Sequence, residues 1–113
     1  PTIYGDGGQS RDFSYIDNVV NANLKATVAT KGIGEAFNIA CGERITLNEL
    51  CKKINKILGT DFPSMYADVR QGDVRHSLAD ISKAQSCLKY SPNINVDEGL
   101  ELTVEWYRQR LNL

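Results

Sequence analysis

Arginine and aspartate gather in two short stretches that lie far apart in the sequence. One is RQGDVRHSLAD at residues 70–80, and the other is GDGGQSRDF at residues 5–13, where a glycine-rich turn precedes the charged pair. A guanidinium group is planar, permanently charged and able to donate two parallel hydrogen bonds, which suits a diphosphate better than the ammonium group of lysine does. Arg11 and Arg70 are therefore the natural candidates for contact with phosphate.

A simpler interpretation of these residues stays open beside that one. Arg11 and Arg70 could be surface arginines that pair with the nearby Asp12 and Asp73, since exposed pairs of this kind are common and stabilise by only about 0–1 kcal/mol. Asp73 could accept hydrogen bonds from ribose hydroxyls, although an aspartate that follows Gly72 also fits an ordinary turn. The residue types alone do not choose between a binding site and two solvated loops.

Motifs for bond-making chemistry are absent from the sequence. His76 is the only histidine, and no Ser, Cys or carboxylate stands in a pattern that would partner it in catalysis. The glycines at residues 5–8 lack both the strand–GxGxxG–helix arrangement and the lysine of a P-loop. No tyrosine is followed four residues later by lysine, and HExxH, CxxC and GxSxG do not occur. The sequence therefore predicts binding without catalysis.

Length and composition indicate one folded α/β domain. The 113 residues include 42% hydrophobic and 24% charged residues, which is ordinary for a globular protein. A net charge of −1 argues against a nucleic-acid surface, and no apolar run approaches the ~20 residues that span a bilayer. Cys41, Cys51 and Cys87 fit no metal motif, so we expect reduced core cysteines in a cytoplasmic protein. Because the chain begins with Pro1, we interpret it as a piece of something longer.

Hydrophobic periodicity predicts the order β–β–α–β–α–β–α–α. The expected strands or extended segments are residues 2–4, 11–16, 35–40 and 64–70, and the expected helices are residues 17–30, 47–58, 80–90 and 96–111. Thr46 and Glu49 fit a capping box at the start of the second helix, and Asp80 is a candidate cap for the third. The apolar stripes predicted to face the core are Ile16, Val20, Leu24 and Val28 in the first helix and Val96, Leu100, Val104, Tyr107 and Leu111 in the last.

Four segments together resemble a known family. They are PTIYGDGGQSRDFSYIDNVVNANL, EAFNIACGERITLNEL, RQGDVRHSLADISKA and VDEGLELTVEWYR, and they are similar, in family order, to the carboxyl-terminal third of UDP-sugar 4-epimerases of the extended short-chain dehydrogenase/reductase family. The resemblance implies that residues 1–113 form a carboxyl-terminal UDP-sugar-binding domain. The expected fold is a small mixed α/β substrate-binding domain without its Rossmann half.

The resemblance also implies roles for individual residues in holding UDP. Arg11 and Arg70 would bind the diphosphate, and Asp73 would bond the ribose. The backbone around Thr2 and Tyr4 would meet the uracil ring.

Two further positions carry implied roles at the same site. Phe13 would line the uracil pocket, and Ser77 matches the position that gates the sugar. A tyrosine at the gate marks members restricted to UDP-glucose and UDP-galactose, so the small Ser77 implies that N-acetylated UDP-sugars are accepted as well. Asn38 is expected only to satisfy backbone groups.

Enzymes of this kind use tightly bound NAD, according to the resemblance. A tyrosine base removes the O4 proton while C4 gives a hydride to NAD, and the 4-keto sugar turns over before the hydride returns to the other face. The glycine fingerprint, tyrosine and lysine for this chemistry are missing from the 113 residues. We therefore expect the chain by itself to be inactive and to hold no NAD. We also expect the full-length enzyme to be a homodimer, and the chain alone to self-associate.

Two rival functions remain open on the sequence. One is another NAD-dependent nucleotide-sugar enzyme, such as a dehydratase, a decarboxylase or a 5-epimerase. The other is a module that binds nucleotide sugars without catalysis. No nucleic-acid or membrane partner is expected.

Overall fold

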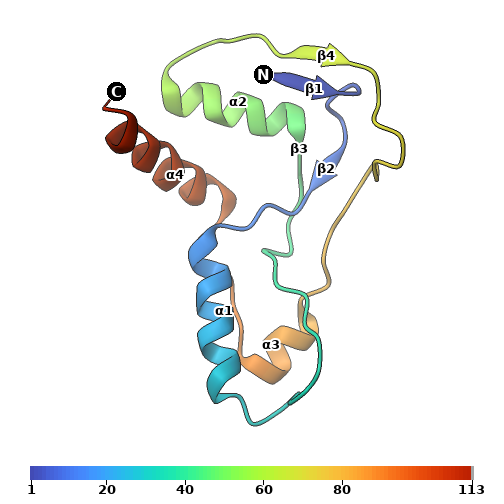
Figure 1. Cartoon of the computed structure of the whole chain (residues 1–113), viewed down its shortest axis with the longest axis vertical. Helices are drawn as coiled ribbons and strands as arrows, with labels where there is room; N and C mark the ends of the chain where they lie inside the picture. The colour runs from blue at the N-terminus through green and yellow to red at the C-terminus, as the bar shows by residue number, and fades with distance from the viewer. Residues whose placement is uncertain (113) are drawn as a thin grey trace.

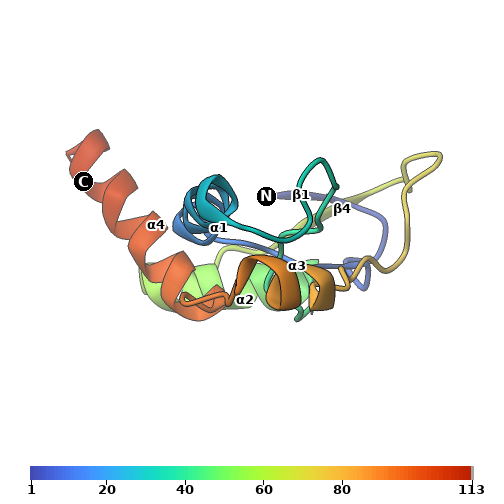
Figure 2. The ribbon, with the colours of Figure 1, turned by 90° about the horizontal axis from the view of Figure 1, so that it is seen from below.

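Residues 1–112 are described by the structure, a computed structural model, and they form a thin slab (Figures 1 and 2). The slab measures 48 × 37 × 18 Å and has a Cα radius of gyration of 16.5 Å, whereas a compact chain of this length has a radius of about 13 Å. Its accessible surface is 7924 Å², and a compact monomer of the same mass exposes about 6,200 Å². The chain therefore leaves more surface open than a self-contained domain of its size.

Four helices and four short strands make up the slab, which confirms the small mixed α/β class. In chain order they are β1 Thr2–Tyr4, β2 Ser10–Arg11, α1 Ile16–Val28, β3 Ile45–Thr46, α2 Leu47–Leu58, β4 Met65–Ala67, α3 Ser82–Leu88 and α4 Val96–Leu111. The strands form two pairs, β1 with β4 in parallel and β2 with β3 antiparallel, with Ile3 opposite Tyr66 and Arg11 opposite Ile45. The strand pairs lie beside α2 at one end of the slab, and α1 and α3 lie at the other end (Figure 1).

Local signals fix the helix ends. Thr46 Oγ1 accepts the Glu49 N–H at 3.1 Å, and the Glu49 carboxylate accepts the Thr46 N–H at 2.7 Å, so the predicted capping box is confirmed. The hydrogen bond from the Thr46 N–H, followed by the one from its hydroxyl, lowers the pKa of Glu49. Gly59 ends α2 in a left-handed conformation with φ of 68°. The N-cap of α3 is Ile81 rather than the expected Asp80, which lies one residue earlier and accepts the Ser82 N–H at 2.9 Å.

The expectation of a strand at residues 35–40 is wrong. This segment pairs with no other strand among residues 1–112, and the strand in this part of the chain is β3 at Ile45–Thr46. A strand needs a neighbour for its backbone groups, and here the side chains of the segment pack on α1 and α3 instead. Ala40 is buried in that core, and its carbonyl accepts the Tyr90 hydroxyl at 2.8 Å. The extended stretches 11–16 and 64–70 also shorten, to strands that end at Arg11 and Ala67.

The hydrophobic core lies between α1, α3 and the segments that join them. Its fully buried members are Ala22, Ala40, Ile81, Ala84, Leu88 and Tyr90. Asn18, on the same face of α1 as Ala22, is 2% exposed, and its side chain bonds the backbone of residues 93–94 through both of its polar atoms. Ala22 and the Asn18 amide therefore form the buried side of α1. Cys41, Cys51 and Cys87 are free thiols and only half-buried, so the expectation that they are core residues is too strong.

The predicted burial of the first apolar stripe is wrong within this chain. Leu24 is 63% exposed and Val28 is 78% exposed, and Ile16 and Val20 are exposed as well. Ile16, Val20 and Leu24 each lie two residues from Asn18 or Ala22, which is about 200° around a helix. Val28 follows Ala22 by six residues, about 240° around, so all four face away from the core. Tyr107 and Leu111 of α4 are likewise exposed rather than inward. Val104 of α4 is buried as expected, so the described residues leave uncovered the α1 stripe and only the carboxyl-terminal end of the α4 stripe.

Candidate functional site

The two charged stretches meet in the fold. Arg11, the last residue of β2, forms an ion pair with Asp73 although 62 residues separate them. The second guanidinium nitrogen of Arg11 donates to the Ser10 carbonyl at 2.8 Å. Asp73 in turn lies in a tight turn, where its N–H donates to the Arg70 carbonyl at 3.1 Å. The structure thus brings Arg11, Arg70 and Asp73 into one neighbourhood.

Backbone hydrogen bonds hold the loop at residues 68–74 at both of its ends. On one side, β4 lies beside β1, and the Gly5 N–H donates to the Ala67 carbonyl at 2.8 Å. On the other side, the Ser10 N–H donates to the Arg75 carbonyl at 3.0 Å, and the Ser77 N–H donates to the Ser10 carbonyl at 3.1 Å. The loop is therefore carried across β1 and β2, which is why Arg70 and Asp73 lie near Arg11.

A groove of about 430 Å³ lies under this loop, which we call the Arg70 groove. Its lining residues are Thr2, Ile3, Tyr4, Gln9, Leu47, Arg70, Gln71, Gly72 and Asp73. Four of the residues that the resemblance assigns to UDP, Thr2, Tyr4, Arg70 and Asp73, therefore share one groove, and Arg11 contacts it through Asp73. The volume lies within the roughly 300–1,000 Å³ of small-molecule sites.

The charges in the groove suit an anion that carries hydroxyl groups. The Arg70 guanidinium carbon lies 4.0 Å from the centre of the Tyr4 ring, a cation–π contact, and Arg70 forms no ion pair within residues 1–112. Its donors are therefore available to a phosphate. Arg11 already holds Asp73, so an anion at Arg11 must compete with that carboxylate.

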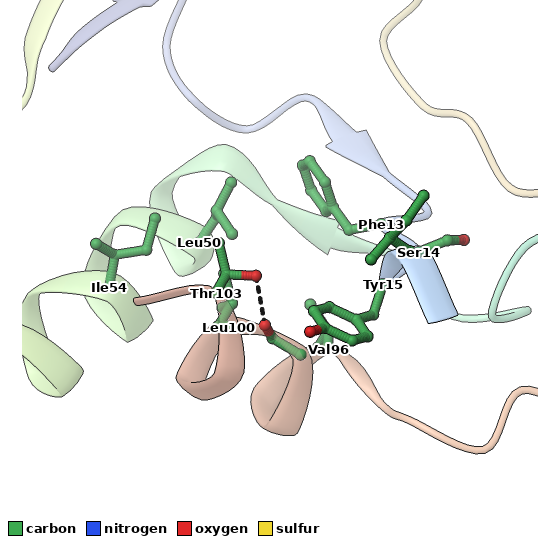
Figure 3. Close-up of a pocket in the computed structure, with 10 residues that line it drawn as sticks. Phe13, Ser14, Tyr15, Leu50, Ile54, Val96, Leu100 and Thr103 are labelled. Carbon is green, nitrogen blue, oxygen red and sulfur yellow. Dashed lines mark hydrogen bonds between the residues drawn. The ribbon is translucent and has the colours of Figure 1, made fainter. Parts of the chain in front are cut away.

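Phe13 does not line the Arg70 groove. It lines a second, apolar cavity of about 290 Å³ between α2, α4 and the segment that joins β2 to α1 (Figure 3). After β2 ends at Arg11, the chain turns toward the apolar faces of α2 and α4, and this turn carries Phe13 away from Tyr4 and Arg70. The expectation that Phe13 lines the same pocket as the uracil-contacting residues is therefore not met here.

Ser77 and Asn38 lie outside the groove as well. Ser77 is exposed and follows directly on the backbone anchor at Arg75, with its N–H bonded to Ser10. Asn38 donates from its amide to the Asp80 carbonyl at 3.3 Å, which agrees with the structural role expected for it. The structure thus fixes the backbone at Ser77 but leaves its side chain at the surface.

The simpler pairing of each arginine with its sequence neighbour is wrong in its partners. The Asp12 carboxylate accepts the backbone N–H groups of Cys41 and Gly42, each at 2.9 Å, and does not pair with Arg11. Arg11 instead crosses to Asp73, and Arg70 lies on Tyr4. The Arg11–Asp73 ion pair therefore joins the two charged stretches, whereas the expected pairs would each have joined residues of the same stretch.

Sequence reasoning missed several residues that shape the site. Asp6 and Arg75 form an ion pair with two hydrogen bonds across the two stretches. Gln9 is 5% exposed and donates to the Tyr4 carbonyl at 2.5 Å. His76 Nδ1 shares a hydrogen bond of 2.8 Å with the buried Ser10 hydroxyl. The Asp6–Arg75 and Ser10–His76 pairs have no local signal, because each joins residues more than 60 positions apart that only the tertiary fold brings together.

The glycine-rich turn at residues 5–8 does not have the setting of a dinucleotide-binding turn. In a dinucleotide site, a glycine-rich turn follows a parallel strand and opens a helix whose N-terminus faces the pyrophosphate. Here the glycine-rich turn after β1 leads into the strand β2 instead. We therefore assign no NAD contact to residues 1–112.

Across residues 1–112, no three His, Cys, Asp or Glu side chains come together as metal ligands could. Among the helices described, none is both long and apolar enough to cross a membrane.

Comparison with known proteins places the sequence of this chain in one family. The profile of the family described as GDP-mannose 4,6 dehydratase matches residues 1–103. A UDP-glucuronate 4-epimerase from Thermodesulfobacterium geofontis is 35% identical over 113 residues, which cover 98% of this chain and 34% of that protein. The chain thus spans about a third of the length of this curated relative.

Solved structures match the fold as well as the sequence. The UDP-glucose 4-epimerase of Thermotoga maritima with UDP-glucose superimposes with a TM-score of 0.91 at 43% identity, over 97% of this chain and 35% of that one. The UDP-glucuronic acid 4-epimerase of Bacillus cereus, in complex with UDP-glucuronic acid and NAD, gives a TM-score of 0.89 at 34% identity, over 96% of this chain and 35% of that one.

Proposed function

This chain belongs to the GDP-mannose 4,6-dehydratase family, and we propose that it is the carboxyl-terminal, UDP-sugar-binding part of an NAD-dependent UDP-sugar 4-epimerase. The complete enzyme would interconvert UDP-glucose and UDP-galactose by inverting C4 through a 4-keto intermediate. NAD would be held by the part of the enzyme that this chain lacks.

One observation carries the proposal. The ion pair between Arg11 and Asp73 brings two charged stretches to the same groove, where Arg70 has donors available for an anion. Permanently charged guanidinium groups suit a diphosphate, and a carboxylate suits the hydroxyls of a ribose. Tyr4 and the backbone near Thr2 supply a surface on which a flat base could lie. The groove thus offers a partner for each part of UDP, although the described residues hold no catalytic motif.

This division of work has a physical reason. A sugar that turns over during the reaction must be held loosely, so the binding energy has to come from the part of the substrate that is remote from the reacting carbon. Charged hydrogen bonds to a diphosphate are strong and lie far from C4. The Arg70 groove would therefore anchor the nucleotide while the catalytic groups act elsewhere.

A related activity is supported by one finding. The matching family is named for a 4,6-dehydratase, and such an enzyme could bind its nucleotide through the same kind of groove. The Arg70 groove does not by itself distinguish the two reactions, because both act on the sugar and the groove would hold the nucleotide. A 4,6-dehydratase is therefore the second candidate.

Incubation of the complete enzyme with NAD and UDP-galactose tests the proposal. We expect UDP-glucose to form, and we expect none from the 113-residue chain alone under the same conditions, because it lacks the catalytic tyrosine and lysine. Chromatography of the nucleotide sugars measures both. Formation of a 4-keto-6-deoxy sugar in place of the epimer would favour the dehydratase, and turnover by the chain alone would show that the chemistry lies within it.

The exposed apolar face of α1 predicts self-association of the isolated chain. The accessible surface of the whole chain, 7924 Å², exceeds that of a compact monomer of the same mass by about 1,700 Å². This excess is close to the total area buried in a standard protein interface. We expect the sedimentation coefficient of the chain to rise with concentration, because the stripe at Ile16, Val20, Leu24 and Val28 would pair between copies.

A charged substitution in the stripe distinguishes association through the α1 face from non-specific hydrophobic association. Leu24→Glu is expected to reduce the association, whereas Asn23→Glu, on a neighbouring exposed position of the same helix, is expected to leave it largely unchanged. A chain that sediments as a monomer at high concentration would rule out the prediction. In the complete enzyme the same face would be covered by the missing part, and we propose a homodimer for that enzyme.

A further inference from the structure

We propose that Asp6 and Arg75 are positioning residues, whose ion pair holds the two charged stretches together so that the Arg70 groove is formed before the nucleotide arrives. Neither residue lines the groove. The inference rests on the proposed function, since it names what prepares the same site for its ligand.

The contact between Asp6 and Arg75 has the geometry of a strong charged pair. Arg75 Nη1 donates to Asp6 Oδ1 at 2.7 Å and Nη2 donates to Oδ2 at 2.9 Å, so the planar guanidinium and the carboxylate meet at two points. The Gly8 N–H donates to the same Oδ1 at 2.8 Å. The Arg75 hydrogen bond, followed by the one from Gly8, lowers the pKa of Asp6 to about 2, so the carboxylate stays charged at neutral pH.

The loop at residues 5–9 is shaped to admit this pair. A Cβ atom at Gly8 would lie 2.7 Å from Arg75 Nη2, so only glycine lets the guanidinium approach without a shift. On the other side, the Asn48 amide donates to the Asp6 carbonyl at 2.9 Å, and the Asn48 N–H donates to the Gly7 carbonyl at 3.0 Å. The loop is thus held between α2 and Arg75, and Asp6 is fixed from both sides.

Arg75 transmits this fixed position to the groove. Its carbonyl accepts the Ser10 N–H at 3.0 Å, and Ser10 immediately precedes Arg11. In the other direction, Arg75 follows Asp73 by two residues and closes the loop that carries Arg70. Through its side chain and its backbone, Arg75 therefore sets where Arg70 and Asp73 stand relative to Arg11.

Affinity is the property that this arrangement should control. A loop that is already ordered loses less conformational freedom when a ligand binds, so a fixed loop binds more tightly than a mobile one with the same contacts. The side chains of Arg75 and Asp6 are 57% and 64% exposed, and exposed ion pairs add little to global stability. Loss of the pair should therefore weaken nucleotide binding much more than it lowers the melting temperature.

A double-mutant cycle in the complete enzyme tests the inference. Asp6→Asn and Arg75→Gln are each expected to weaken UDP binding, measured by calorimetry, by about three- to tenfold. The UDP affinity of the double variant should be no lower than that of the single variant with the lower affinity, because both changes remove one shared contact. Arg75→Lys keeps the charge but cannot make the two-point contact, so its affinity should lie between those of the wild type and Arg75→Gln.

A matched pair elsewhere in the chain provides the control. Lys83 and Glu35 form an ion pair of similar exposure, 48% and 54%, beside α3 and away from the groove, and Lys83→Gln should leave UDP affinity unchanged. In steady state, Arg75→Gln should raise KM for UDP-galactose and leave kcat nearly unchanged, because the pair acts on the anchored nucleotide rather than on the reacting carbon.

The possible results separate this inference from the proposed function. Wild-type enzyme that fails to bind UDP contradicts the proposed function itself. Wild-type binding with unchanged affinity in both single variants overturns only the positioning role. Losses that add fully in the double variant also overturn it, since independent sites would be responsible. If Arg75→Gln does not fold, Arg75→Lys and Asp6→Asn give the same comparison with smaller changes.

Discussion

Replacing Arg70 with alanine in the complete enzyme is expected to weaken UDP binding by about 1.5–3 kcal/mol, or roughly tenfold to 150-fold. Arg70 lines the groove and forms no ion pair within residues 1–112, so its donors should go to the ligand. Alanine removes charged hydrogen bonds to a diphosphate and also the cation–π contact with Tyr4. Calorimetric titration with UDP measures the change directly.

Arg11 should respond differently from Arg70, which makes it an informative comparison. Arg11 is already paired with Asp73 before any ligand binds, so a diphosphate gains its contact only by replacing a carboxylate that loses its partner. The net loss on Arg11→Ala should therefore be smaller than the loss on Arg70→Ala. Arg44→Ala, at an exposed arginine outside the groove, is the control and should leave the titration unchanged. A wild-type titration curve from Arg70→Ala would remove Arg70 from the site.

Local signals in the sequence predict all four helices, but with different accuracy at the ends. The third helix is shorter than expected, Ser82–Leu88 in place of residues 80–90. The capping box at Thr46 and Glu49 and the left-handed Gly59 depend only on residues within one helix, so the pattern specified both ends of α2. The stripe on α1 is also an apolar face of that helix, but a sequence pattern does not show which other segment packs against such a face. In this chain the opposite face, with Asn18 and Ala22, is the buried one.

The candidate site was predictable in its residue types and less so in its geometry. Arg11, Arg70 and Asp73 were chosen for the chemistry of their side chains, and the fold brings them together. The resemblance implies that Phe13 lines the uracil pocket, yet the chain turns after β2 and carries Phe13 to another cavity. Asp6 and Arg75 are 69 residues apart, and their contact exists only because β1 and β2 lie beside β4 and the segment that follows it.

The same reasoning explains why residues 35–40 were expected to form a strand. An apolar run between glycines has the composition of a strand, but pairing requires a neighbour, which residues 1–112 do not provide there. In both this segment and the α1 stripe, the local pattern indicates an apolar element but does not specify what that element contacts. Contacts of this kind depend on the tertiary fold, and so the pattern alone does not predict them.

Ser77→Tyr is expected to suppress turnover of UDP-N-acetylglucosamine by the complete enzyme while sparing UDP-glucose. The Ser77 N–H is bonded to the Ser10 carbonyl, so the backbone there is held and a tyrosine ring must extend into the space that the small hydroxymethyl group leaves. The Ser77 side chain is exposed within residues 1–112, and the gate role requires that the complete enzyme packs the sugar against it. Crowding of an added group in such a packed site costs about 1–3 kcal/mol, which corresponds to a roughly fivefold to 150-fold loss of kcat/KM for the bulkier substrate. UDP-glucose has no acetyl group to clash, so its kcat/KM should change little.

Ser77→Ala separates the size of the side chain from its hydroxyl. Alanine keeps the space open, so both substrates should react nearly as they do with the wild type, and a selective loss in Ser77→Tyr alone would then be steric. Assays with UDP-glucose and UDP-N-acetylglucosamine on the three proteins give the ratio of kcat/KM values that defines specificity. An equal loss of both substrates in Ser77→Tyr would mean that the tyrosine disturbs the anchor at Ser10 and Arg75. In that case residue 77 would act on the nucleotide groove and would not gate the sugar.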